Sequence, residues 1–334
     1  MPGRYPARVA VMTSETSTQA HGQSWGLAAM GLAISAWGLT SVLIKSIDMD
    51  ALPLAFWRFA VYAVLITAWV RSRGGRINVR VIKRSAPGGL CLAGDVMLFF
   101  IAVKLTNVVN ATTIGALQPL VVGVVAARMF GERVRPREIA AALAAIGGVV
   151  AIVVESAGTP EWSGAGDLAA AGTLFAWSGY FIFAKRAAGT LTPVEYTAGT
   201  SWWTAAVALP IGLIAGSDMT PPPRSEWLML IGLIILGGVL GHAMMNWAIV
   251  RVPLWLGSTL TLLIPVVSSI AAWVFLDEAL TGVQVIAMGV VVAALASIVM
   301  SQRAAPVETS TEEQSLHSGS SNVVDSFPES DKCG

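Results

Sequence analysis

Long runs of apolar residues, separated by short polar segments, extend over most of this 334-residue chain. A helix that crosses the ~30 Å hydrocarbon core of a bilayer needs ~20 mostly apolar residues. Ten runs meet or approach that requirement, each with bounds good to about three residues. The predicted membrane-spanning helices are 25–44, 52–70, 87–103, 111–130, 139–154, 168–183, 197–215, 227–249, 257–275 and 283–300. Because the connections are short, the pattern predicts an all-α integral membrane protein with no inserted soluble domain.

The two ends of the chain differ from this apolar middle. Residues 1–24 are polar and have no apolar core of the kind found in secretory signal peptides. We therefore expect them to form an N-terminal segment in the cytoplasm. Residues 301–334 are rich in Ser, Thr and acidic residues, a composition that predicts a disordered acidic tail.

Composition narrows the class of protein. Hydrophobic residues make up 55% of the chain and charged residues 12%, about half the share found in soluble domains. The mean hydropathy is +0.69. These values exclude a nucleic-acid-binding protein, a disulfide-stabilised scaffold, a disordered chain and an ordinary soluble enzyme. Cys91 and Cys333 show no disulfide or metal-ligand spacing, so no metal site is expected.

The distribution of basic residues predicts the orientation, because cytoplasmic loops carry an excess of Lys and Arg. With the N-terminus in the cytoplasm, 17 of the 21 Lys and Arg residues fall on the cytoplasmic side. Lys45, Lys104 and Arg224 fall on the other side, and Arg58 lies within the second span. This asymmetry requires an even number of spans, with both termini cytoplasmic.

The chain contains an internal repeat. Shifting the fourth and fifth spans by 146 residues places 111–154 on 257–300 without a gap, and earlier spans repeat at an offset of 140. The matched pairs include Pro119/Pro265, Glu132/Glu278, Trp37/Trp177 and Lys45/Lys185. The chain is therefore predicted to be a duplicated five-helix unit, 25–154 and 165–300.

Five spans is an odd number, so the second copy must insert upside down relative to the first. The charges agree, because the loop after the fourth span carries Arg133, Arg135 and Arg137, whereas its counterpart at 277–282 carries no Lys or Arg. Inverted repeats are typical of secondary transporters, whose substrate site lies near the midplane between the halves. We expect ten helices in two inverted five-helix repeats around a central cavity.

The repeated unit resembles the EamA-type domain of the drug/metabolite transporter superfamily, over nearly all of residues 25–300. The motifs that carry the resemblance are Lys45, Pro53 and Phe56–Phe59, Leu117–Leu120 before Phe130–Arg133, and the second-half echoes Ile264–Pro265 and Leu276–Glu278. The resemblance implies two antiparallel halves that carry small metabolites or drugs without ATP. The second repeat departs from the first at Ala198, which stands where the first repeat has Arg58.

Two prolines are expected to bend spans four and nine. Pro119 and Pro265 lie in the middle of these runs, where proline removes a donor and frees the carbonyls of Gly115 and Thr261. Free carbonyls in a membrane must face protein or a water-filled cavity. We expect kinked helices that line the cavity, with Gln118 among the lining residues; a kink that only shapes packing is the alternative.

Three charged or titratable residues lie deep in the predicted spans. Asp95 in span three and His242 in span eight stand on repeat-related helices, and Arg58 is the one deep cation. Such residues are costly in a bilayer, at ~2.5–3.5 kcal/mol on insertion scales. We expect Asp95 and His242 to couple solute movement to protons and Arg58 to bind an anionic group. The alternatives are a structural hydrogen-bonded pair and an arginine that extends to the membrane surface.

Several other residues are weaker candidates for a role in solute binding, helix capping or helix packing. Trp37, Trp177 and Trp247 lie deep, where their rings either stack on a solute or fill space. Glu132 and Glu278 are expected to cap the helices that follow them. Gly237 and other glycines of span eight are expected to pack helices inside the bundle or between the protomers of a homodimer.

These features predict a secondary active transporter that moves a small metabolite or drug-like solute by alternating access across a prokaryotic plasma membrane. A multidrug exporter and a membrane receptor or channel remain alternatives. An intramembrane hydrolase would need a Ser–His or paired-Asp constellation, which the sequence lacks, and there is no Walker A motif. We therefore expect no enzyme activity, no cofactor and no nucleic acid, and only the solute and the bilayer as partners.

Overall fold

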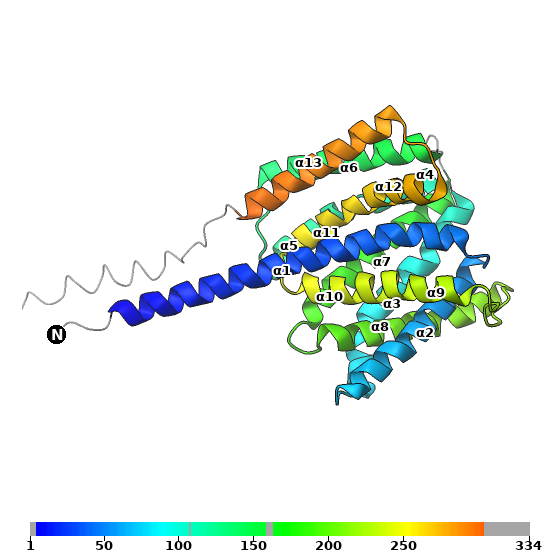
Figure 1. Ribbon diagram of the computed structural model, residues 1–334, viewed down its shortest axis with the longest axis horizontal. Helices are drawn as coiled ribbons and strands as arrows, with labels where there is room; N and C mark the ends of the chain where they lie inside the picture. The colour runs from blue at the N-terminus through cyan, green and yellow to red at the C-terminus, as the bar shows by residue number, and fades with distance from the viewer. Residues whose placement is uncertain (1–4, 107, 158–162, 304–334) are drawn as a thin grey trace, which may run out of the picture. The chain divides into compact units, whose positions relative to one another are not determined.

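The computed structural model describes residues 5–106, 108–157 and 163–303, and the regular structure in these residues is helical (Figure 1). The helices are α1 (Tyr5–Ser46), α2 (Ala51–Ser72), α3 (Val79–Leu105), α4 (Val108–Gly115), α5 (Gln118–Phe130), α6 (Pro136–Ala157), α7 (Gly164–Ala187), α8 (Pro193–Ile214), α9 (Trp227–Leu233), the π-helix η1 (Ile234–Ala243), α10 (Met244–Ile249), α11 (Leu254–Leu260), the 3₁₀ turn η2 (Thr261–Leu263), α12 (Ile264–Leu276) and α13 (Gly282–Arg303). From residue 304 onward, the predicted acidic tail lies outside the described residues.

Each predicted span coincides with a helix or with a consecutive set of helices. Helix α1 is longer than expected, because residues 5–24 continue the helix that contains the first span. Helix α3 likewise begins at Val79, where Asn78 accepts a hydrogen bond from the Val81 N–H and so caps the helix. Apolarity marks where a helix enters lipid, and it does not mark where the helix begins.

Eight helical stretches of the described chain are long and apolar enough to cross a membrane. They are Gly22–Ser46, Ala51–Ser72, Val79–Ala102, Asn110–Phe130, Pro136–Ala157, Trp227–Ile249, Leu254–Leu276 and Gly282–Gln302. Helices α7 and α8 cover the two remaining predicted spans and have similar lengths, 24 and 22 residues. Their polar side chains are turned inward; in α8, Thr197, Thr200 and Thr204 are buried and donate to carbonyls of their own helix.

The prolines break their helices where a bend was expected. Pro119 lies in the first turn of α5 and Pro265 in the first turn of α12. Proline is well suited to that position, since the first turn needs no N–H partner within the helix. The expectation of an unpaired carbonyl at Thr261 is wrong, because the 3₁₀ turn lets it accept from the Ile264 N–H.

The same local structure recurs at positions 146 residues apart. Gly131 follows the last residue of α5 and Asp277 follows the last residue of α12, and both have left-handed backbones, with φ of 65° and 53°. The following N–H groups, of Glu132 and Glu278, donate to equivalent carbonyls in the two helices. Asp277 is the single non-glycine residue with positive φ in the described chain. The sequence repeat is therefore matched by a repeat of backbone geometry.

Helices from the two halves of the sequence pack against one another. Helix α3 packs on α7 and α8, α2 packs on α8, and α1 packs on α12 and on the η1–α10 stretch. Figure 1 shows α1 lying alongside α11 and α12, with α6 and α13 forming a neighbouring pair. The core is thus built between the halves, and it brings α1, α2, α3, α7 and η1 together.

Close packing between α3 and α8 gives a stability prediction. A Cβ added to Gly88 would lie 1.8 Å from the Tyr196 hydroxyl, whereas a Cβ on Gly147 in α6 would meet nothing within 4 Å. We expect Gly88→Ala to destabilise the protein by about 1–3 kcal/mol, because overpacking displaces neighbours. Thermal unfolding in detergent tests this, with Gly147→Ala as the matched control. Equal melting temperatures for the two variants would contradict it.

Candidate functional site

The π-helix η1 lies at the centre of the candidate site. Its glycines allow large side chains to approach its backbone: a Cβ on Gly237 would be 2.4 Å from Arg58 Nη2, and a Cβ on Gly241 would be 2.2 Å from Trp37 Nε1. The Trp37 indole N–H donates to the Gly237 carbonyl at 3.2 Å. These glycines therefore pack helices within the chain, against α1 and α2. π-Helical segments are rare and occur often at functional sites.

An aromatic cluster surrounds His242 in this helix. The His242 ring lies 5.3 Å from Trp37, 5.6 Å from Phe59 and 5.8 Å from Tyr180, measured between ring centroids. Trp177 contacts both Trp37 and Tyr180, at 5.4 and 5.5 Å. The repeat-related tryptophans therefore meet each other, as edge-to-face rings, beside the histidine.

Two opposite charges border this cluster without an ion-pair partner in the described chain. The Arg58 guanidinium lies 5.2 Å from the Phe59 ring and acts electrostatically on His242, and its Nε is buried with no hydrogen bond. Asp95 on α3 interacts electrostatically with Tyr180 rather than directly with His242. The Tyr62 hydroxyl is also buried without a partner. Uncompensated polar atoms of this kind are costly, so they mark a place where a polar ligand would be favoured.

The two helix breaks touch each other across the halves. Thr261 Oγ1, in the second break, lies 3.1 Å from the side-chain amide of Gln118 at the first break, while its own hydrogen is donated to the Ser258 carbonyl at 2.6 Å. Gln118 is 2% exposed, and its Nε2 has no partner. Thr113 Oγ1, in α4, is likewise buried without a hydrogen bond. The breaks thus contribute two further unsatisfied groups to the interior.

Of the residues predicted from the sequence to form the substrate site, the structure brings together Trp37, Trp177, His242 and Arg58. Asp95 is connected to this group through its electrostatic interaction with Tyr180. Trp247 lies outside the cluster, because the Arg251 guanidinium stacks on its ring at 3.7 Å. Sequence analysis missed Tyr180, Asn246 and Thr197, which hydrogen-bond beside His242. Their spacing along the sequence could have identified two of them, because residues three or four apart lie on the same face of a helix. Asn246 stands four residues after His242, and Tyr180 stands three residues after Trp177.

Glu132 and Lys185 connect several helices at one end of the bundle. The Glu132 carboxylate accepts from the N–H groups of Leu254 and Trp255, at 2.6 and 2.9 Å, so it caps α11. Lys185 donates to the Val252 carbonyl and is electrostatically attracted to Glu132. The expectation that Glu132 caps the helix following it is wrong, because Glu138 performs that role at the start of α6. Helix α11 consequently packs against α5.

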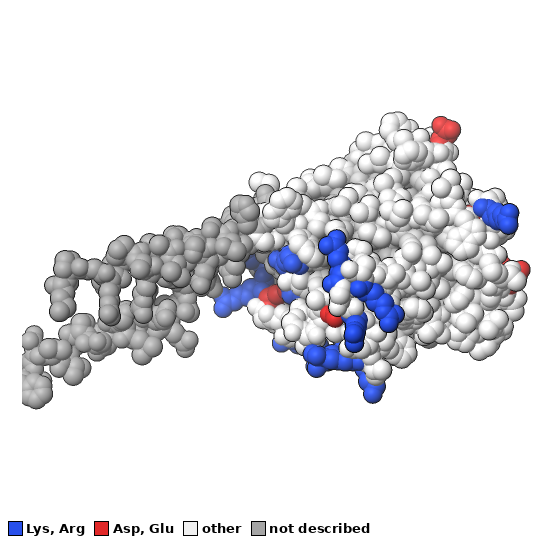
Figure 2. Space-filling view, turned by 60° about the horizontal axis from the view of Figure 1, so that its bottom comes forward, with Lys and Arg blue, Asp and Glu red and all other residues white. Residues whose placement is uncertain are grey.

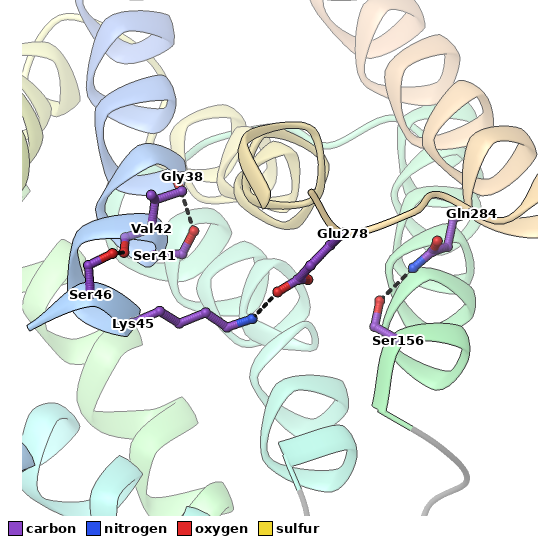
Figure 3. Close-up of polar contacts among 8 residues, drawn as sticks. All are labelled: Gly38, Ser41, Val42, Lys45, Ser46, Ser156, Glu278 and Gln284. Atoms are coloured by element: carbon purple, nitrogen blue, oxygen red, sulfur yellow. Dashed lines mark hydrogen bonds and ion pairs between the residues drawn. The ribbon is translucent and has the colours of Figure 1, made fainter. Parts of the chain in front are cut away.

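The equivalent residues at the other end are arranged differently. Lys45 reaches from the end of α1 to Glu278 beyond α12, over 2.5 Å, and both side chains are at least half exposed (Figure 3). Among the described residues, α4 packs on α6 and α7 and makes at most marginal contact with α12. Asp167 holds this end of α4, accepting from Asn110 at 2.8 Å; that hydrogen bond lowers the pKa of Asp167 below its ordinary value.

The surface is suited to a bilayer. Figure 2 shows the Lys and Arg side chains of this face gathered mainly in one region, with wide areas free of charge. Large apolar side chains are exposed, including Ile214 at 87% and Leu228 at 80%. An open crevice of about 380 Å³ between α6 and α13 is lined by apolar residues such as Ala144 and Ile286. No polar group of the candidate site lines this crevice, so it is separate from that site.

Comparison with known proteins identifies the family. The model of the EamA-like transporter family matches residues 24–154 and again residues 164–300. The chain belongs to the EamA-like transporter family. The two matches coincide with the two copies of the repeat, so this is a multi-pass membrane protein built from two EamA units.

Two curated relatives of this EamA protein are named as amino acid exporters. It is 31% identical over 210 residues to the aromatic amino acid exporter YddG of Ancylobacter novellus, covering 57% of this chain and 70% of the relative. It is 24% identical to the threonine/homoserine exporter RhtA of Salmonella typhimurium, covering 62% and 67%. A solved crystal structure matches with a TM-score of 0.72 at 25% identity, covering 85% of this chain and all of that one.

Proposed function

We propose that this EamA protein is a secondary active exporter of amino acids or closely related solutes. It works by alternating access through ten spans in two inverted repeats, in a prokaryotic plasma membrane with both termini cytoplasmic. The observation that carries the proposal is the unpaired Arg58 guanidinium beside the Trp37, Trp177 and His242 rings. An amino acid offers the groups these residues need: a carboxylate for Arg58 and an apolar or aromatic side chain for the rings. The names of the exporter relatives support this class.

Alternating access is supported by the unequal ends of the bundle. The Glu132–Lys185 end is joined by part-buried hydrogen bonds, whereas the equivalent Lys45–Glu278 end is joined by an exposed pair. If the halves exchange conformations, Glu278 and Lys45 take up the contacts that Glu132 and Lys185 now make. The present state is then closed toward the basic, cytoplasmic side and accessible from the other side.

Removing the charge of Glu132 is expected to loosen the closed end. Hydrogen bonds to charged groups contribute about 1.5–3 kcal/mol, so Glu132→Gln should accelerate amide exchange at Leu254 and Trp255 about 10- to 100-fold. Hydrogen–deuterium exchange of the peptide containing both amides measures this. Glu278→Gln is the matched control and should leave that peptide unchanged, because exposed pairs contribute little. If amide exchange in this peptide increased equally in the two variants, the proposed difference between the two ends of the bundle would be refuted.

Proton coupling belongs to the same proposal, with Asp95 as the stronger candidate of the two predicted groups. Its carboxylate has no hydrogen bond or ion pair in the described chain, so it is free to exchange a proton or contact a solute ammonium group. His242 is engaged with Tyr180. A homodimer remains a prediction.

Flux in proteoliposomes tests the function directly. We expect labelled aromatic and small neutral amino acids to exchange across the vesicle membrane, with faster accumulation when a proton gradient is imposed. Excess unlabelled solute inside should accelerate uptake, since counterflow is a property of carriers and not of channels or receptors. Resistance of overexpressing cells to toxic cations, without amino acid flux, would favour the multidrug exporter instead.

A further inference from the structure

A chain of hydrogen bonds connects four buried side chains between α8 and η1. Asn246 Nδ2 donates to Thr197 Oγ1 at 2.9 Å and to the Tyr180 hydroxyl at 2.8 Å. The Tyr180 hydroxyl in turn lies 3.3 Å from His242 Nδ1. All four side chains are at most 5% exposed. In such surroundings each polar atom needs a partner, so the positions of the hydrogens can be deduced.

Thr197 determines the direction of the first hydrogen bond in this chain. A threonine hydroxyl has one hydrogen, and Thr197 donates it to the Pro193 carbonyl at 2.7 Å. Thr197 Oγ1 can therefore only accept from Asn246, which fixes the amide with its NH₂ group toward Thr197 and Tyr180. The second hydrogen of that NH₂ group goes to the tyrosine oxygen.

The direction of the next bond follows. The Tyr180 oxygen accepts from Asn246, and its own buried hydrogen has no acceptor among the described residues other than His242, so Nδ1 is the acceptor. An imidazole that accepts at Nδ1 is neutral and carries its hydrogen on Nε2. In the described part of the chain, Nε2 has no hydrogen-bond partner, so it is an available donor.

The groups around His242 favour the same state. Arg58 from α2 is the charged group that acts on the imidazole, and its positive charge disfavours a second one. Tyr180 from α7 is the titratable group in contact with the ring, and Asp95 from α3 acts electrostatically on Tyr180 and on Cys91 rather than on His242. Trp37 from α1 and Phe59 from α2 contribute rings without charge. Gly237, which touches Arg58, lies five residues before His242, about one turn of a π-helix, so both face the same side.

We propose that Asn246 is a positioning residue which, through Tyr180, holds His242 as the neutral Nε2–H tautomer. His242 and Arg58 together then present hydrogen-bond donors to an acceptor group of the solute, such as a carboxylate. This assignment of a solute contact rests on the proposed function, whereas the tautomer does not. His242 is accordingly a fixed donor in this state, and proton movement falls to Asp95.

Nitrogen NMR tests the tautomer without any transport assay. The chain has three histidines, so replacing His21 and His317 with glutamine leaves a single ¹⁵N-labelled ring. Long-range ¹H–¹⁵N spectra of the full chain in nanodiscs at pH 7 should show hydrogen on Nε2 and an unprotonated Nδ1. A ring protonated on Nδ1, or on both nitrogens, would overturn the proposal.

Three variants test the role of Asn246. Asn246→Asp cannot donate, so Tyr180 should turn its hydrogen to the new carboxylate and His242 should gain hydrogen on Nδ1. Tyr180→Phe should abolish the preference for Nε2–H, whereas Thr197→Ser keeps the hydroxyl and should preserve it. An unchanged tautomer in folded Asn246→Asp protein would refute the positioning role. If solute binds as proposed, its apparent affinity should fall about tenfold or more in that variant; an unaltered affinity beside an altered tautomer would count against the proposed solute contact alone.

Discussion

Replacing Arg58 with glutamine is expected to weaken solute binding about 30-fold or more. Truncating one partner of a buried charge pair costs about 2–5 kcal/mol, and each 1.4 kcal/mol is tenfold in affinity. Arg58 has no ion-pair partner among the described residues, so the solute carboxylate would be its counter-ion. Binding of labelled amino acid to purified protein and the KM of counterflow measure the effect. Arg58→Lys keeps the charge and loses the planar fork, so it should be intermediate.

Arg58→Gln is not expected to lower the stability of the folded protein. An unpaired charge within a membrane is costly, so Arg58→Gln is expected to unfold at the same temperature as the native protein or higher. Arg224→Gln changes an exposed arginine in the loop before α9 and serves as the matched control. An affinity for solute within about threefold of the native value in Arg58→Gln would remove Arg58 from the site.

Replacing Asp95 with asparagine is expected to abolish accumulation driven by a proton gradient. Asparagine has nearly the same shape and cannot release a proton, so a carrier that depends on this group loses its coupling. Counterflow needs no net proton movement and should persist in the variant. The measurement is the ratio of gradient-driven uptake to counterflow in the same proteoliposomes.

Asp50→Asn is the control for this experiment, because Asp50 is an exposed carboxylate before α2 whose side chain caps no helix. It should leave the ratio unchanged. Gradient-driven uptake at the native level in Asp95→Asn would exclude Asp95 from coupling. Loss of counterflow as well would indicate that Asp95 binds the solute rather than the proton. His242→Gln provides a further comparison, since a glutamine amide retains a donor and should keep coupling.

The sequence was sufficient to predict where the helices lie, and it indicated a duplicated unit. Burial of backbone polar groups in lipid leaves few alternatives to a helix of ~20 apolar residues, so hydropathy alone indicates where the helices lie. Paired residues such as Pro119 and Pro265 indicated the repeat in the sequence. In the structure, Gly131 and Asp277, which are 146 residues apart, have the same left-handed backbone conformation. The family match over both copies agrees with that duplication.

Only the tertiary structure decided which residues meet. Depth along a helix can be counted from sequence, but its rotation depends on packing, so Trp247 lies outside the cluster and Asn246, one residue earlier, lies inside it. The π-helix changed the register further, because its wider turn places Gly237 and His242 on one side. Contacts between distant segments, such as Glu132 with the amides of α11, have no local signature. The sequence determined where the helices lie, whereas side-chain packing between the two halves determined which residues meet at the candidate site.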